Sequence, residues 1–219
     1  MNQTVKNNPF EKLAGRYDAW FDSPRGQKIF AAETHNLRHL LEKLPRPWLE
    51  VGVGTGRFAQ ALGVDDGIDP SPEVLKTAIQ RNIKIWLGYA EHLPFADSTY
   101  GTVLMIVTIC FLSEPVKALR EAKRVLRSNG HLLLGLVPKN SPWGNFYEHK
   151  GQADHSFYSV ATFYTCEDVV KMAVSAGFSL EKSRSCLFES PKTKVDAYSN
   201  SRENIVAGSG FVGMCFKKE

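Results

Sequence analysis

A glycine-rich turn between an apolar segment and a helical segment constrains the fold of this chain more than any other feature. Residues 49–57 read LEVGVGTGR, and a helical pattern starts at Arg57. Glycine adopts positive φ angles without steric penalty and lets a ligand approach the main chain closely. A strand, a glycine turn and a helix at the carboxyl edge of a parallel sheet form a nucleotide-type site. The pattern therefore predicts an α/β sheet with a ligand site at Gly52, Gly54 and Gly56.

Two nucleotide ligands suit such a turn, and the flanking residues favour one of them. A dinucleotide fingerprint reads G-x-G-x-x-G/A, whereas the last position here is Arg57, too bulky for a close helix–strand contact. Glu50, at the tip of the strand, would repel a pyrophosphate but attract a ligand that carries an amino group and a sulfonium. S-adenosylmethionine is such a ligand. The turn favours it, and NAD stays as the less favoured alternative.

Four segments resemble, in order, the motifs of one family. Residues 49–56 look like motif I (E/D-x-G-x-G-x-G) of the class I S-adenosylmethionine-dependent methyltransferases. Residues 67–71 (GIDPS) resemble the end of the family's second strand, and residues 90–95 (AEHLPF) resemble the A-E-x-L-P-F signature of its small-molecule "type 11" branch. Residues 119–130 resemble its L-x-E-x-x-R-V-L helix and the glycine turn before strand five. The resemblance covers the chain from residue 49 to about residue 137.

The resemblance implies an S-adenosylmethionine site built from several strand ends. The three glycines would approach the methionine and ribose, Glu50 would attract the amino group, and Asp69 would bind both ribose hydroxyls. Adenine would lie beside Ala90 and Glu91, and Thr108 or Ile109 would lie under the sulfonium. The cofactor-binding residues predicted in this way are Glu50, Gly52, Gly54, Gly56, Asp69, Pro70, Ala90, Glu91 and Thr108.

The same residues also have structural interpretations. The glycines suit an ordinary βα turn, Glu50 suits a helix cap, and Asp69 suits an Asx-turn before Pro70. The sequence leaves these alternatives open.

The order of apolar and helical patterns predicts the fold class. Parallel strands are expected at residues 48–51, 64–69, 84–87, 102–111 and 131–137, with Gly130 ending the helix before the last of them. Two closing strands are expected at 178–187 and 211–217, after a helix that starts with a Thr165–Asp168 capping box. This order indicates an open, doubly wound, mostly parallel sheet. The resemblance implies the seven-stranded Rossmann-like methyltransferase fold, with an antiparallel strand near one edge.

The chain length fits a single methyltransferase domain, residues 1–219. Within it we expect a helical N-terminal lid (1–44), a cofactor-binding core (45–137), a substrate-side insertion (138–164), and a C-terminal helix with closing strands (165–219). Aromatic residues in the lid and the insertion would hold a flat or cationic acceptor, or would only pack these segments on the core. The acceptor-binding candidates are Tyr17, Trp20, Trp143 and Tyr147.

The composition of the chain limits the classes of partner that this protein is expected to have. The formal net charge is +4 and the basic residues are scattered, so no nucleic-acid-binding stripe is evident. The four cysteines lack metal-type spacing, no apolar run approaches the ~20 residues of a membrane span, and the polar N-terminus lacks a secretion signal. These features predict a cytoplasmic protein without a nucleic-acid, membrane or metal partner. Its oligomeric state stays open.

Methyl transfer from a sulfonium is an in-line displacement that proximity and alignment accelerate. An unprotonated amine needs no strong base, whereas a hydroxyl acceptor benefits from one. His35, His149 and His155 are the candidates for such a base, and each is expected to be a surface or hydrogen-bonding histidine, so none is assigned as catalytic. The sequence thus predicts methyl transfer to a nitrogen or oxygen of a small molecule.

Other functions are weighed against this one. The main alternative is a non-catalytic protein that binds S-adenosylmethionine or S-adenosylhomocysteine. A nucleic-acid methyltransferase is disfavoured, because residues 108–111 read TICF where base-amino methylators have N/D-P-P-Y/F.

Overall fold

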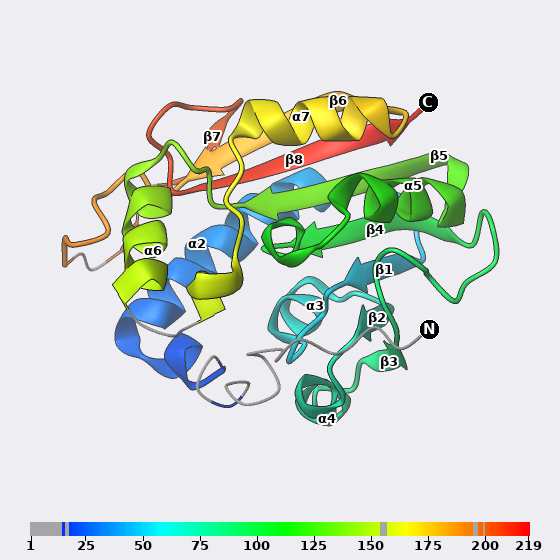
Figure 1. Ribbon diagram of the computed structural model, residues 1–219, viewed down its shortest axis with the longest axis horizontal. Coiled ribbons are helices and arrows are strands. Elements are labelled where there is room, and N and C mark those ends of the chain that lie inside the picture. The colour runs from blue at the N-terminus through cyan, green and yellow to red at the C-terminus, as the bar shows by residue number, and fades with distance from the viewer. Residues whose placement is uncertain (1–14, 16–17, 154–156, 195–196, 199) are drawn as a thin grey trace.

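The computed structural model describes residue 15 and residues 18–153, 157–194, 197–198 and 200–219, which form one sheet flanked by helices (Figure 1). The strands of the described chain are β1 (Trp48–Val51), β2 (Asp66–Asp69), β3 (Lys84–Leu87), β4 (Tyr100–Ile106), β5 (Leu126–Leu136), β6 (Phe178–Cys186), β7 (Arg202–Glu203) and β8 (Phe211–Lys218). They lie in the order β3-β2-β1-β4-β5-β8-β6-β7.

The predicted α/β architecture is confirmed. β3, β2, β1, β4 and β5 pair in parallel, and β8 runs antiparallel between β5 and β6. The sheet has eight strands in place of the expected seven, because Arg202 and Glu203 form the short edge strand β7 against β6. Two exposed charged residues carry no strand-like pattern, so β7 was not predictable from the sequence.

Helices cover both faces of the sheet. Helices α2 (Pro24–Leu41), α3 (Arg57–Leu62) and α6 (Pro142–Ala153) pack into one hydrophobic core. Helices α5 (Pro115–Val125) and α7 (Cys166–Ser175) pack into the other, and α4 (Pro72–Gln80) lies beside β2 and β3. In Figure 1, α5 and α7 lie in front of the strands.

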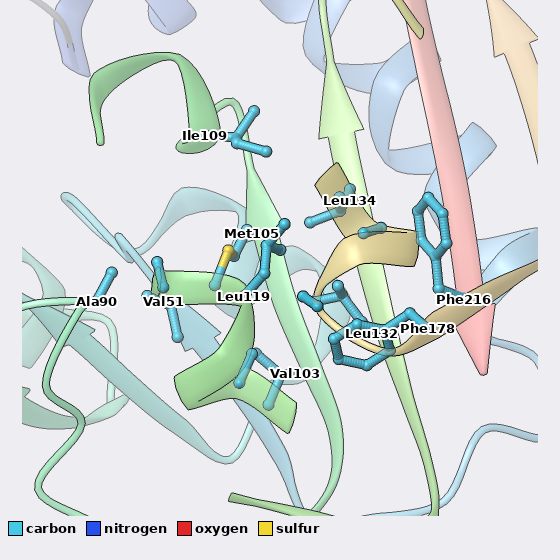
Figure 2. Close-up of a cluster of buried hydrophobic side chains, with 14 of the residues drawn as sticks. Val51, Ala90, Val103, Met105, Ile109, Leu119, Leu132, Leu134, Phe178 and Phe216 are labelled. Atoms are coloured by element: carbon cyan, nitrogen blue, oxygen red, sulfur yellow. The ribbon is translucent and has the colours of Figure 1, made fainter. Parts of the chain in front are cut away.

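The central strand β4 contributes to both cores. Val103 and Met105 belong to the α5–α7 core, whereas Leu104 belongs to the α2–α3 core. Figure 2 shows the α5–α7 core, in which Leu119 of α5 and Phe178 of β6 lie near the strand residues. Side chains that alternate between two apolar faces are expected of a parallel strand covered on both sides.

Two strand boundaries differ from the prediction. β4 ends at Ile106, and the chain turns at Val107 (φ 53°) into the short 3₁₀ helix η1 (Ile109–Phe111). The apolar run from 102 to 111 conceals this turn, because Ile109 is as buried as the strand residues. β2 begins at Asp66 rather than at residue 64.

The prediction that Gly130 ends the helix before β5 was wrong. Helix α5 ends at Val125, and Leu126 is already extended and pairs with Tyr100 of β4. Leu126 is fully buried, so its packing in the sheet outweighs its helix propensity. Local signals mark the helix but not the residue at which tertiary packing stops it.

Side-chain caps define two further helices. Thr165 and Asp168 form the predicted capping box at the start of α7, which is confirmed. The segment 138–164, predicted as an insertion, contains α6 and the 3₁₀ helix η2 (Phe157–Val160). Ser141 Oγ accepts a hydrogen bond from the Gly144 amide at 2.9 Å, and Pro142 follows it at the first helical position. This serine–proline pair was an available start signal for α6.

Among the helices that the structure describes, none is long and apolar enough to span a lipid bilayer.

Candidate functional site

The turn after β1 brings backbone and open space together. Gly52, Gly54 and Gly56 have positive φ angles of 73°, 54° and 82°. A Cβ atom at Gly52 would lie 2.3 Å from Thr108 Cγ2, so the turn packs directly on the chain that follows β4. A Cβ atom at Gly54 would meet no atom within 4 Å. The backbone at Gly54 is therefore accessible to a ligand.

A cavity of 510 Å³ lies beyond the carboxyl ends of β1, β2 and β4. Its volume is in the range of small-molecule sites, roughly 300–1,000 Å³. All the predicted cofactor-binding residues except Gly56 line it: Glu50, Gly52, Gly54, Asp69, Pro70, Ala90, Glu91 and Thr108. A Cβ atom at Gly56 would lie 2.5 Å from Ile83 Cδ1, so this glycine permits packing of the turn. Ile109, the alternative to Thr108, is buried in the α5–α7 core.

Glu50 is an unpartnered buried acid in the wall of the cavity. It is 2 % exposed, and its Oε2 atom has no hydrogen-bond partner within the described chain. Burial, reinforced by the nearby Asp69 carboxylate, raises its pKa well above the ordinary value. Helix α3 starts after Gly56 without a side-chain cap, so Glu50 does not cap it. The Glu50 oxygen is thus available to a ligand that donates a hydrogen bond.

Asp69 is held by the main chain at the end of β2. Its carboxylate accepts hydrogen bonds from the Gly54 amide at 3.0 Å and the Ser71 amide at 2.9 Å. The second bond closes the Asx-turn that the sequence suggested. Burial raises the pKa of Asp69, and the two backbone donors oppose that shift. Each oxygen keeps a further lone pair, so the turn and ligand binding are compatible.

The segment after β3 supplies the opposite wall of the cavity. Glu91 accepts a hydrogen bond from the Ser113 hydroxyl at 3.1 Å, which joins this wall to the segment after β4. Thr108 donates to the Ile106 carbonyl at 3.1 Å. Glu50, Asp69 and Glu91 place three carboxyl groups on the wall of the cavity, which suits a ligand with hydrogen-bond donors or a positive charge better than a pyrophosphate.

A cluster that the sequence reasoning missed fastens the N-terminal segment to the glycine turn. The Asp18 carboxylate accepts hydrogen bonds from Thr55 Oγ1 at 2.6 Å, Arg57 Nε at 2.7 Å and Arg81 Nη2 at 2.9 Å. Partial burial would raise the pKa of Asp18, but the hydrogen bonds from Arg57, Arg81 and Thr55 outweigh this effect and hold the pKa far below its usual range. Arg57, which argued against a dinucleotide site, is therefore the residue that anchors the helical residues 18–22.

A second cavity, of 50 Å³, shares Phe21, Phe58, Val107 and Phe111 with the larger one. We call it the aromatic cavity, because most of its wall is aromatic. Two of the acceptor-binding candidates, Trp20 and Tyr147, line the aromatic cavity.

The other two acceptor-binding candidates do not line it. Trp143 is buried outside both cavities, where it donates a hydrogen bond to the Glu189 carbonyl at 2.8 Å. Its ring lies 6.1 Å from that of Tyr147. Tyr17 lies outside the described residues.

The aromatic cavity also contains Glu33 of α2, which the sequence reasoning missed. A charged helix residue normally lies on the solvent face, so composition gave no warning. The spacing does carry a signal: Glu33 stands four residues after Ile29 and four before Leu37, and both of these apolar residues are buried on the same face of α2. A carboxylate in the middle of such an apolar face indicates a buried acid.

The other candidate groups lie elsewhere. His35 and His149 are exposed and line neither cavity, and His155 is outside the described residues. No group of three or more metal-ligand side chains occurs among the described residues.

Known proteins share this arrangement. The family described as "Methyltransferase domain" matches residues 49–134. A solved structure from Thermotoga maritima, named as a SAM-dependent methyltransferase and possible histamine N-methyltransferase, has a TM-score of 0.88 and 32 % identity, over 96 % of this chain and 98 % of that chain. An uncharacterized protein of Mycobacterium tuberculosis is 37 % identical over 210 residues, 94 % of this chain and 74 % of that protein. A demethylmenaquinone methyltransferase of T. maritima is 27 % identical over 168 residues, 64 % of this chain and 73 % of that enzyme.

The α/β fold with its mostly parallel sheet is that of the Rossmann-like methyltransferase enzymes. The chain belongs to the S-adenosylmethionine-dependent methyltransferases and matches their type 11 branch, as its motifs predicted.

Proposed function

We propose that this methyltransferase transfers the methyl group of S-adenosylmethionine to a nitrogen or oxygen atom of a small molecule. When bound, this cofactor supplies an electrophilic methyl group on a sulfonium. The observation that carries the proposal is that two cavities with different chemistry lie side by side and share part of their walls. One is acidic and faces the glycine turn, the other is aromatic, and Phe21, Phe58, Val107 and Phe111 lie on both.

The wall of the larger cavity fits the cofactor. The free Glu50 oxygen suits the amino group, and the backbone at Gly54 leaves room for the chain that carries the sulfonium. Asp69, with lone pairs to spare, suits the ribose hydroxyls. Ala90 and Glu91 suit the adenine edge. Gly56 contributes indirectly, by allowing the turn to close on Ile83.

The aromatic cavity supports a small acceptor. Trp20 and Tyr147 would contact it, and Trp143 would hold the Tyr147 ring from behind. The volume of 50 Å³ accommodates only a compact group, which is unfavourable for a nucleic-acid base. The T. maritima relative is named as a possible histamine N-methyltransferase, which supports a nitrogen acceptor here also.

The chain's own contribution to catalysis is alignment. Apolar side chains at the junction, among them Phe21, Phe58 and Phe111, exclude water from the transfer path. Proximity and alignment of two bound reactants supply roughly 7–11 kcal/mol. The described histidines lie away from both cavities, which is compatible with an acceptor amine that needs no strong base.

Two measurements test the proposal. Titration calorimetry with S-adenosylhomocysteine should give saturable binding, about tenfold weaker in Asp69→Asn and unchanged in the exposed control Asp97→Asn. Transfer of a labelled methyl group to a panel of small amines and alcohols should show turnover. Binding without turnover on any acceptor would favour the non-catalytic alternative. Absence of binding would overturn the cofactor assignment.

A further inference from the structure

Glu33 is the carboxyl residue on the wall of the aromatic cavity, and it has no counter-ion among the residues that the structure describes. It is 6 % exposed, and no Lys or Arg of the described chain forms a salt bridge with it. An unpaired carboxylate in an apolar site costs several kcal/mol unless it is protonated or meets a cation. Because Glu33 lies on the wall of the aromatic cavity, a ligand bound in this cavity would supply the cation.

Aromatic rings form most of the wall around Glu33. Tyr147 of α6 and Tyr158 of η2 stack at 4.6 Å between centroids, and Trp20 and Phe163 also line the cavity. The ammonium group of Lys150 lies 5.6 Å from the centroid of the Tyr158 ring, so this ring already attracts one cation. Aromatic faces attract ammonium groups, and a carboxylate beside them adds a charge-assisted hydrogen bond. A neutral polar ligand would gain much less from the same wall.

We propose that the aromatic cavity binds a cationic amine of the methyl acceptor, with Glu33 as its counter-ion. This inference rests on the proposed function and names its substrate class: small molecules with an ammonium group at one end and a nucleophilic atom further along. A volume of 50 Å³ has room for an ammonium head and a short linker. The nucleophilic atom then lies toward Val107 and Phe111, at the junction with the cofactor cavity.

Binding of the amine changes the protonation of Glu33. Burial raises the pKa of Glu33 to about 8, so near neutral pH the free protein holds it mostly as the acid. The titratable groups that face it are the Tyr147 and Tyr158 phenols and the Cys110 and Cys186 thiols. Burial raises the pKa of Tyr158 and of both thiols, so they stay neutral. An incoming ammonium therefore displaces one proton from Glu33 to solvent, and no covalent bond of the ligand breaks.

Calorimetry on the protein saturated with S-adenosylhomocysteine tests the inference. The probes are primary amines with alkyl, aryl and heteroaryl tails, each paired with the alcohol of the same skeleton. At least one amine should bind about tenfold more tightly than its alcohol. Glu33→Gln should lose about 10- to 100-fold in amine affinity and keep its affinity for S-adenosylhomocysteine. The control Glu42→Gln, at the exposed end of the same helix, should behave as wild type.

A second readout measures proton release rather than affinity. Amine titrations at pH 6.5 in two buffers of different ionisation enthalpy should report the release of close to one proton by the wild-type protein and of none by Glu33→Gln. Equal binding of amines and alcohols, full amine affinity in Glu33→Gln, or binding without proton release would overturn the inference. If S-adenosylhomocysteine binds but no amine does, this inference alone is overturned. If wild type does not bind S-adenosylhomocysteine, the proposed function is overturned.

Discussion

The carboxylates at the ends of β1 and β2 are buried in different ways, and the difference predicts different roles. Asp69 receives two backbone amides, which fix its orientation. Glu50 has an oxygen with no partner in the described chain, and burial raises its pKa. A buried acid without a donor is unfavourable in the free protein and becomes favourable when a ligand supplies the donor.

We therefore expect Glu50→Gln to separate binding from stability. Its free energy of unfolding should stay close to that of wild type, because burial already favours the neutral acid of Glu50 and glutamine is a neutral side chain of the same shape. Its affinity for S-adenosylhomocysteine should fall about 10- to 100-fold, because a charge-assisted hydrogen bond is lost. Urea denaturation and calorimetry measure the two quantities, with the exposed Glu73→Gln on α4 as control. Unchanged affinity would contradict a role for Glu50 in the cofactor site.

The raised pKa of Glu33 makes the free energy of unfolding decrease as the pH rises. Its pKa rises from 4.5 in the unfolded chain to about 8 in the folded protein, so between these values the folded protein holds a proton that the unfolded chain has lost. The stability that this proton contributes is fully present below pH 4.5 and is lost as the pH rises through 8. The loss reaches at most about 1.4 kcal/mol per pH unit. Glu50 and Asp69 also have raised pKa values and remain in both proteins, so stability measured by denaturation should fall more steeply from pH 5 to pH 8 in wild type than in Glu33→Gln, and parallel curves would contradict the role of Glu33.

At the scale of elements, the N-terminal segment and the glycine turn behave as one unit. Asp18 lies between Thr55, Arg57 and Arg81, and it is only 17 % exposed. Removing one partner from such a cluster leaves cations unpaired in a partly buried site. The cluster thus places Phe21, which follows it closely in the chain, on the wall of both cavities.

Asp18→Asn should loosen this unit. We expect a loss of about 2–4 kcal/mol in stability and faster amide hydrogen exchange in residues 18–22. Asp22→Asn is the matched control, because Asp22 also pairs with Arg57 but is 65 % exposed, and it should lose less than about 1 kcal/mol. Similar losses in the two variants would show that Asp18 makes only a surface contact.

Elements with local signals were predictable from the sequence, and those made by tertiary contacts were not. The glycine turn and the Thr165–Asp168 box carry their own backbone and hydrogen-bond chemistry, and both helices start where predicted. Leu126 became a strand residue through pairing with Tyr100, which lies 26 positions earlier in the chain. Glu33 and Asp18 acquire their roles from partners far along the sequence, so single-residue chemistry could not identify them.

At the scale of the whole molecule, one sheet supports both cavities. The parallel strands end at the larger cavity, whereas the aromatic cavity lies among α2, α6 and the residues 18–22. The two cavities share four side chains, and the Asp18 cluster connects the segment that carries Phe21 to the glycine turn. A ligand in either cavity therefore restrains the same wall.

Shared walls predict positive coupling between the two ligands. If S-adenosylhomocysteine binds at the glycine turn as proposed, it should restrain the segment with Phe21, and the amine that follows should then lose less entropy on binding. We expect about fivefold tighter amine binding in its presence, and linkage requires the same factor for S-adenosylhomocysteine in the presence of amine. Asp18→Asn should reduce this factor toward one, while Asp22→Asn should keep it. Calorimetric titrations with the two ligands added in both orders measure this coupling factor, and hydrogen exchange of residues 18–22 gives the structural readout. Equal affinities with and without the first ligand would show that the cavities act independently.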